Sequence, residues 1–91
     1  MKQRRAGVSE AMYPYQNQWR MLRQLRGLKQ LDVAHYLNHL NPEHYQDIER
    51  GRIFPQAKIL FRLLALYRVE VGQAYPALMS EAEEAVQRQR P

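Results

Sequence analysis

The 91-residue chain contains no cysteine, which excludes disulfides and thiolate metal sites. It also lacks an apolar run of the roughly 18 residues that a membrane span requires, and no apolar signal core follows its basic N-terminus. No segment alternates between apolar and polar residues as a half-buried strand does. These absences predict one compact all-α domain in a soluble, cytoplasmic protein with no membrane partner.

The usual marks of an enzyme are missing as well. The chain has no glycine-rich phosphate loop, no cysteine nucleophile, and no serine, histidine and acid set that could share one pocket. His35 and His39 are one helical turn apart, but the sequence offers no third ligand beside them, so no zinc site is expected. We expect a protein that is not an enzyme and that binds no cofactor and no metal.

The positive charge is concentrated at one end of the chain. Of the formal net charge of +5, residues 1–30 hold seven Lys or Arg against one Glu, whereas residues 31–60 and 61–91 carry no basic excess. A localised basic patch attracts polyanions, of which nucleic acid is the commonest in a cytoplasm. A solubilising basic tail is the alternative interpretation.

Residues 1–15 show no sustained hydrophobic period and include Pro14, so they are interpreted as a flexible basic arm. Apolar residues recur at a spacing of three over residues 16–26, which predicts a helix. Gly27 suits the left-handed conformation that commonly ends a helix. The basic residues of the arm are Lys2, Arg4 and Arg5.

Two further helices are predicted over residues 30–37 and 42–50. Asn38, which tolerates the left-handed conformation, ends the first of them. Asn41 and Pro42 form the clearest helix start in the chain, because Asn is a preferred N-cap and Pro is favoured at the first helical position.

The rest of the chain predicts three more helices. Residues 57–67 are apolar on most sides, which is typical of a central core helix, and a short fifth helix follows. Ser80 and Glu83 form a capping box that starts a last, mostly polar helix. The expected organisation is an arm over 1–15, a helical domain over 16–79 and a C-terminal helix or tail over 80–91.

The first three predicted helices carry a family pattern. Its matching features are Gly27-Leu28, Gln30, Ala34, Leu37, Leu40, Ile48, Glu49-Arg50-Gly51 and Pro55. In this order they resemble the Cro/phage-repressor type of helix-turn-helix, also called XRE-like, over roughly residues 17–75. Two features differ from the family: the turn at Asn38-His39 is one residue longer, and Lys29 stands where the family often has a Ser or Thr cap.

The resemblance implies a compact five-helix, repressor-like helix-turn-helix domain with an extra short C-terminal helix. It implies a transcriptional regulator that binds double-stranded DNA in the nucleoid, with residues 42–50 in the major groove. It also implies a phosphate contact for Gln30 and a partly buried salt bridge between Arg23 and Glu49. We further expect a homodimer on a palindromic operator. The candidate dimer residues are Tyr75, Leu78, Met79 and Val86.

A helical wheel of residues 42–50, with Tyr45 and Ile48 facing inward, selects the side chains that could reach a groove. The candidate base-reading residues are Asn41, Glu43, Gln46 and Asp47. The candidate phosphate contacts are Lys29, Gln30, His44, Arg50 and Arg52.

Two of these candidates, Glu43 and Asp47, are acidic. A carboxylate in the groove can accept a hydrogen bond from cytosine N4, while its repulsion of phosphates weakens indiscriminate binding that the basic excess would offset. Alternatively, Glu43 only complements the helix dipole and Asp47 is only solvated. The alternative function is a protein-interaction or antitoxin-like module whose acidic third helix or C-terminal tail binds a toxin or co-regulator.

Overall fold

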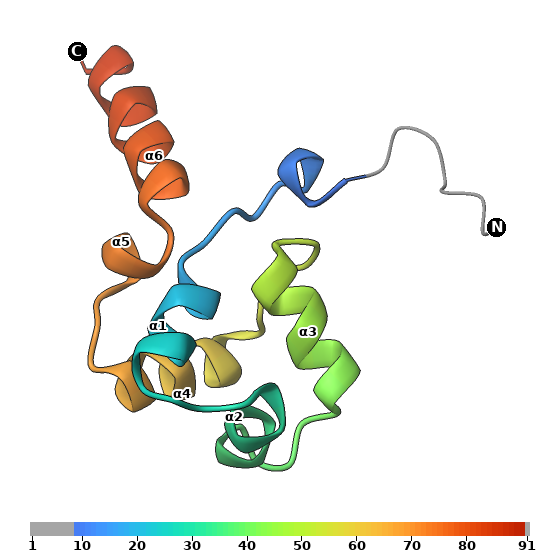
Figure 1. Ribbon diagram of the computed structural model, residues 1–91. Helices are drawn as coiled ribbons and strands as arrows, with labels where there is room; N and C mark the ends of the chain where they lie inside the picture. Colours follow the sequence, from blue (N-terminus) through green and yellow to red (C-terminus); the bar gives the residue numbers. More distant parts are fainter. Residues whose placement is uncertain (1–8, 91) are drawn as a thin grey trace, which may run out of the picture.

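The computed structural model describes residues 9–90, which form six α-helices and one 3-10 helix and no strand. Helices α1 to α5 gather around one core, and α6 extends away from it (Figure 1). The all-α, five-helix domain with an extra C-terminal helix is confirmed. The elements are η1 (Glu10–Met12), α1 (Trp19–Leu25), α2 (Gln30–Tyr36), α3 (Pro42–Arg50), α4 (Ala57–Tyr67), α5 (Val71–Ala74) and α6 (Pro76–Arg88).

Aromatic side chains form the centre of the core. The ring of Trp19 lies 5.9 Å from that of Tyr67 and meets Tyr75 edge-on at 5.6 Å. The Trp19 indole N–H donates to the Tyr75 hydroxyl at 2.8 Å, so this buried polar pair is satisfied. Burial raises the pKa of Tyr75 to about 12. These contacts fix α1 against α4 and the end of α5.

The turn between α2 and α3 uses two left-handed residues. Asn38 has φ 64° and His39 has φ 59°, and the backbone N–H of Leu40 closes the turn on the carbonyl of Ala34 at 3.0 Å. Two consecutive left-handed residues accommodate the extra residue of this turn. The sequence identified Asn38 as a left-handed residue, but His39 carried no comparable signal.

His39→Gly is expected to stabilise the fold by about 0.5 kcal/mol, because glycine adopts positive φ without the Cβ penalty but loses more chain entropy. The melting temperature should rise by roughly 2–4 °C. Asn38→Gly is the matched control, and its gain should be smaller because the short Asn side chain can hydrogen-bond locally in the left-handed region. A fall in melting temperature for His39→Gly would contradict this account of the turn.

Helix α3 begins and ends where its sequence signals place it. The Asn41 Oδ1 accepts a hydrogen bond from the backbone N–H of Glu43 at 2.8 Å, and Pro42 occupies the first turn. Gly51 ends the helix in the left-handed conformation with φ 90°. Both boundaries therefore follow from local side-chain chemistry.

One sequence expectation about the later helices is wrong, and one is confirmed. Helix α6 begins at Pro76, so Ser80 and Glu83 lie inside it and do not cap it. A proline in the first turn is as good a start signal as a capping box, and in this chain the helix begins at the proline. Helix α4 is the expected core helix, with Leu63 and Tyr67 fully buried, although its Phe61 is 67% exposed.

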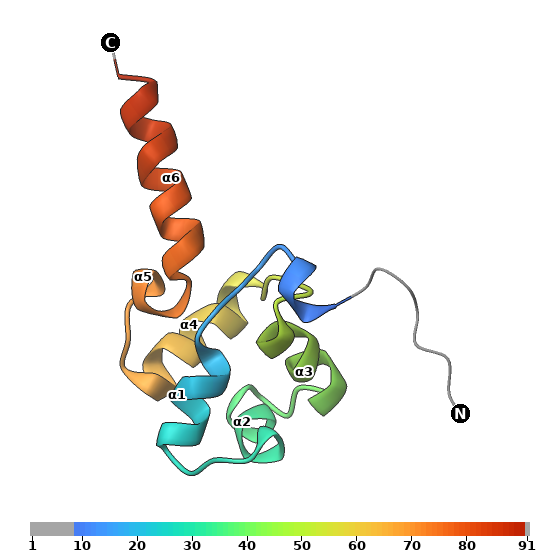
Figure 2. The same cartoon turned by 45° about the horizontal axis from the view of Figure 1, so that its top comes forward.

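The chain before α1 lies beside the C-terminal end of α3 (Figure 2). The backbone N–H of Tyr15 donates to the carbonyl of Gly51 at 2.9 Å, and the Tyr15 ring lies 5.5 Å from that of Phe54. The part of the expected arm over residues 9–15 is thus attached to the domain. The arm residues Lys2, Arg4 and Arg5 lie outside the described residues.

Candidate nucleic-acid interface

Helix α3 has one buried face and one accessible face. Tyr45 and Ile48 are fully buried and Glu49 nearly so, and they seat the helix against α1, α2 and α4. Glu43 and His44 are exposed on the other side. An α-helix with this division can enter a major groove with its accessible face toward the base edges.

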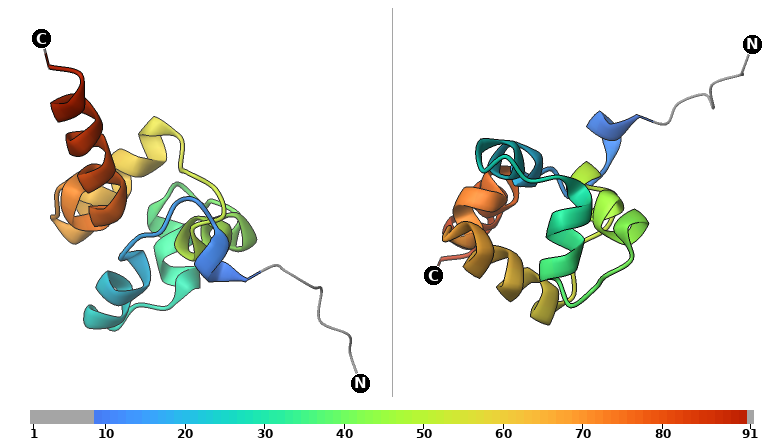
Figure 3. Two further views of the ribbon diagram at one scale, coloured as in Figure 1. Left: turned by 90° about the horizontal axis from the view of Figure 1, so that it is seen from above. Right: turned by 60° about the horizontal axis from the view of Figure 1, so that its bottom comes forward.

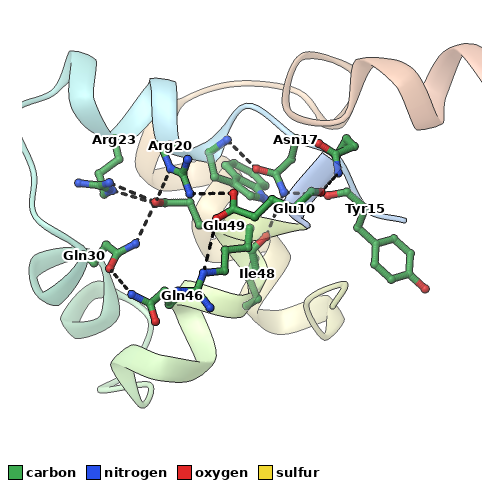
Figure 4. Close-up of polar contacts among 12 residues, drawn as sticks. Glu10, Tyr15, Asn17, Arg20, Arg23, Gln30, Gln46, Ile48 and Glu49 are labelled. Carbon is green, nitrogen blue, oxygen red and sulfur yellow. Dashed lines mark hydrogen bonds and ion pairs between the residues drawn. The ribbon is translucent and has the colours of Figure 1, made fainter. Parts of the chain in front are cut away.

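The carboxylate of Glu49, on the buried face of α3, connects three helices. Arg23 donates from Nε to Glu49 Oε2 at 2.8 Å and from Nη2 to Oε1 at 3.1 Å. The Tyr45 hydroxyl donates to Oε2 at 2.7 Å, and Gln30 Nε2 donates to Oε1 at 3.0 Å. Arg20 Nε lies 3.5 Å from Oε1. Figure 4 shows Arg20 and Arg23 of α1 and Gln30 of α2 converging on Glu49 of α3.

The ionisation of Glu49 follows from these donors. Burial by itself would raise the pKa of Glu49, but the hydrogen bonds from Arg23, Tyr45 and Gln30 outweigh it and hold this pKa below its usual value. The hydrogen bond to Glu49 likewise raises the pKa of Arg23. Both groups are therefore charged near neutral pH, and the ion pair is held in a largely buried position.

A chain of amides runs from this carboxylate to the surface of α3. Gln30, at the start of α2, donates to Glu49 and accepts from Gln46 Nε2 at 3.3 Å through its own Oε1. Gln46 is half-buried. The side chain of Gln46 is thus oriented by a neighbour that is itself oriented by the buried ion pair, and part of Gln30 is already engaged within the protein.

The two acidic candidates differ in their surroundings. The Asp47 carboxylate accepts from Arg52 Nη1 at 3.4 Å, and its side chain is only 26% exposed. Glu43 is exposed and makes no ion pair among residues 9–90. Both border a shallow hollow of about 560 Å³ between α3 and α4, whose lining is Leu40, Asn41, Glu43, His44, Asp47, Gln56 and Ile59.

The basic candidates lie around the two helices. Lys29 is exposed at the start of α2, where its backbone N–H donates to Asp32 Oδ2 at 2.8 Å. This bond supplies the acid half of a capping box, so the missing Ser or Thr does not prevent the helix from starting. Arg50 lies 3.8 Å from Glu10, and Arg52 is exposed beside Asp47.

Sequence reasoning missed the role of residues that precede α1. Glu10 is 3.3 Å from Arg20 and 3.8 Å from Arg50, and thus links α1 to the end of α3. Asn17 Nδ2 donates to the carbonyls of Tyr15 and Ile48, both at 2.9 Å. The sequence offered two signals for these roles. Glu10 is the single acidic residue among residues 1–30, and Asn17 stands two residues before Trp19.

The described part of the chain offers neither a metal-binding cluster nor a membrane-spanning helix. No group of three or more His, Asp or Glu side chains that could hold a metal ion gathers there, although the His35 and His39 rings are 4.6 Å apart. None of the helices within residues 9–90 is long and apolar enough to cross a membrane.

Comparison with known proteins adds one finding. A family model described as helix-turn-helix matches residues 20–73, more than half of the chain. The match takes in α2, α3 and α4 and ends inside α5, so α6 lies outside it. Searches of curated proteins and of solved structures gave no match.

Proposed function

The chain belongs to the XRE-like helix-turn-helix family, and from this membership we propose that it is a repressor-like transcriptional regulator that binds specific DNA sequences. Helix α3 would lie in the major groove of each half of a palindromic operator. Two copies would bind half-sites separated by about one helical turn of DNA. Its place of action would then be the nucleoid.

The observation that carries this proposal is the way α3 is held. Its inward face is fixed by the Glu49 carboxylate, and Gln46 is connected to that carboxylate through Gln30. A groove-reading side chain whose position is set before binding avoids the conformational entropy cost of being ordered on the DNA. In this protein, the hydrogen bonds through Gln30 order the Gln46 side chain before any DNA is bound.

We divide the proposed roles among the candidate residues according to their contacts. Because Asp47 already pairs with Arg52, Glu43 is the acid we assign to cytosine, with Gln46 and the Asn41 amide as its neighbours. Phosphate contacts would come from the basic side chains around α2 and α3. We assign these contacts to Lys29, His44, Arg50 and Arg52.

The test of the proposed function is selection of bound duplexes from a random pool, repeated at two salt concentrations. A specific regulator should enrich one short, two-fold symmetric sequence. The slope of log affinity against log salt should give the number of phosphates contacted, at about 0.9 per contact. Equal affinity for the enriched duplex and for random DNA at fixed salt would refute the proposal.

Glu43→Gln is expected to reduce discrimination in favour of cytosine at one operator position by about 1–3 kcal/mol, because an amide can also donate to other bases. Affinity for random DNA should rise, since one phosphate-repelling charge is removed. The measurement is competition binding of base-substituted duplexes. Glu84→Gln makes the same charge change on α6 and should leave the base preference unaltered. An unchanged preference in Glu43→Gln would remove Glu43 from the reading set.

A further inference from the structure

Helix α6 is the longest helix among the described residues, yet it buries none of its own residues. It packs on α5 at its first turns and then extends away from the domain, as Figure 2 and the left view of Figure 3 show. It also lies beyond the segment that the family model matches. Isolated helices of this length are marginal in water and are normally stabilised by packing. Its exposed length therefore needs a partner.

One side of α6 is apolar. At 100° per residue, the five apolar residues from Leu78 to Val86 fall within an arc of about 120°, while Ala77 lies on the opposite side. The stripe continues at its N-terminal end into an apolar groove of about 220 Å³, which Phe54, Val71 and Tyr75 complete. Val86, farther along the stripe, is 68% exposed. The members of the stripe are Leu78, Met79, Ala82, Ala85 and Val86.

The charges along the two edges of this stripe identify the partner. Glu81 and Arg88 border one edge, and Glu83 borders the other. Glu81 and Arg88 are seven residues apart, or about two turns, so they share an edge. A second α6 running in the opposite direction would place Arg88 of each copy beside Glu81 of the other. In a parallel pair, Glu81 would instead face the edge that carries Glu83, and like charges would meet.

We propose that α6 is the surface through which two copies of this chain associate, with their α6 helices antiparallel across a two-fold axis. This inference rests on the proposed function for its purpose, because it supplies the homodimer that a palindromic operator requires. The association itself needs no DNA.

The charge pattern also sets the register. If Glu81 of one copy faces Arg88 of the other, the two-fold axis passes between residues 84 and 85, and Ala85 is the stripe residue closest to it. The small side chain there permits close approach of the two helices. Val86 of each copy then covers Ala82 of the other, at the open end of the apolar groove.

Molar mass measured by light scattering without DNA tests the association. At a chain concentration of about 100 µM, the wild-type protein should show twice the monomer mass of 10.9 kDa. Val86→Glu should be a monomer, while Gln87→Glu, the same new charge on the opposite face, should remain a dimer. A monomeric wild type, or a Val86→Glu dimer, would overturn the proposal. Because DNA is absent, either result is independent of whether the chain binds an operator.

Introduced cysteines test the orientation, since the chain has none of its own. Ala85→Cys should form an intermolecular disulfide under mild oxidation. Leu78→Cys should not, because in an antiparallel pair the two positions are about 20 Å apart at 1.5 Å rise per residue, far beyond the reach of a disulfide. Cross-linking of Leu78→Cys would indicate a parallel pair and contradict the antiparallel arrangement.

Exchange of the edge charges gives a further readout. Glu81→Arg and Arg88→Glu should each weaken the dimer when measured alone, because each brings like charges together at both ends of the interface. An equimolar mixture of the two variants should recover the dimer as a heterodimer. Failure of the mixture to associate would show that these edges do not face each other.

Discussion

Glu49→Gln is expected to destabilise the protein by about 3–5 kcal/mol, the cost of removing one member of a buried ion pair. Arg23 would keep its charge with its side chain only 14% exposed, and would lose the carboxylate that its Nε and Nη2 both contact. Tyr45 would also lose the acceptor of its buried hydroxyl. A domain of this size has a total stability of only about 5–15 kcal/mol, so the variant should be partly unfolded at moderate temperature.

Urea denaturation followed by circular dichroism measures this effect. Glu84→Gln is the matched control, because Glu84 is 71% exposed in its pair with Arg88 and exposed ion pairs contribute little. Its unfolding midpoint should stay close to that of the wild type. A Glu49→Gln midpoint as high as that of the control would show that the buried pair adds nothing over a neutral hydrogen bond.

The pH dependence has a definite sign. The pKa of Glu49 is lower in the folded chain than in the unfolded one, so the unfolded state binds the proton more readily. The resulting stabilisation is complete above the unfolded glutamate pKa of about 4.3 and is lost as the pH falls through the lowered folded value. Glu49→Gln should therefore lose less stability than the wild type on acidification below about pH 4.

The sequence predicted those parts of the fold that depend on neighbouring residues. The Asn41-Pro42 start of α3, its end before Gly51 and the left-handed conformation of Gly27 are each set by local chemistry, and the structure contains all three. The start of α6 shows the limit of such signals. Two were present within five residues, and the sequence contains nothing that ranks Pro76 above Ser80.

The candidate site was harder to predict because its connections are long-range. A helical wheel gives the direction of Asp47 from the helix axis, but it cannot show that Arg52 from the following loop reaches the carboxylate. Similarly, the wheel identifies Gln46 as accessible without showing that Gln30, sixteen residues earlier, is hydrogen-bonded to it. The types of residue at the site could be predicted, whereas the pairing among them depends on tertiary packing.

Gly51→Ala is expected to destabilise the protein by about 2–5 kcal/mol, as the sum of two penalties. Gly51 has φ 90°, which an L-residue adopts at a cost. A Cβ at this position would also lie 2.7 Å from the carbonyl oxygen of Tyr15 and 3.0 Å from its carbonyl carbon. These are backbone atoms, so the contact cannot be relieved by a side-chain rotation, and the segment before α1 would have to move.

Gly27→Ala separates the two penalties. Gly27 has φ 67°, but a Cβ there would meet no atom within 4 Å. Its substitution should therefore cost only the left-handed strain of about 1–2 kcal/mol. The difference between the two unfolding free energies measures the contact between Gly51 and Tyr15. Equal losses in the two variants would mean that the segment before α1 moves aside without cost.

Displacement of the segment around Tyr15 in Gly51→Ala also has a consequence for DNA binding. Moving the Tyr15 segment would draw Glu10 away from Arg20 and Arg50, which it contacts at 3.3 and 3.8 Å. Two cations beside α3 would then be available to phosphates. Below its melting temperature, Gly51→Ala should consequently bind random duplex DNA more tightly than Gly27→Ala does, with a steeper dependence on salt. Identical salt slopes for the two variants would show that Glu10 does not compete with phosphate for these arginines.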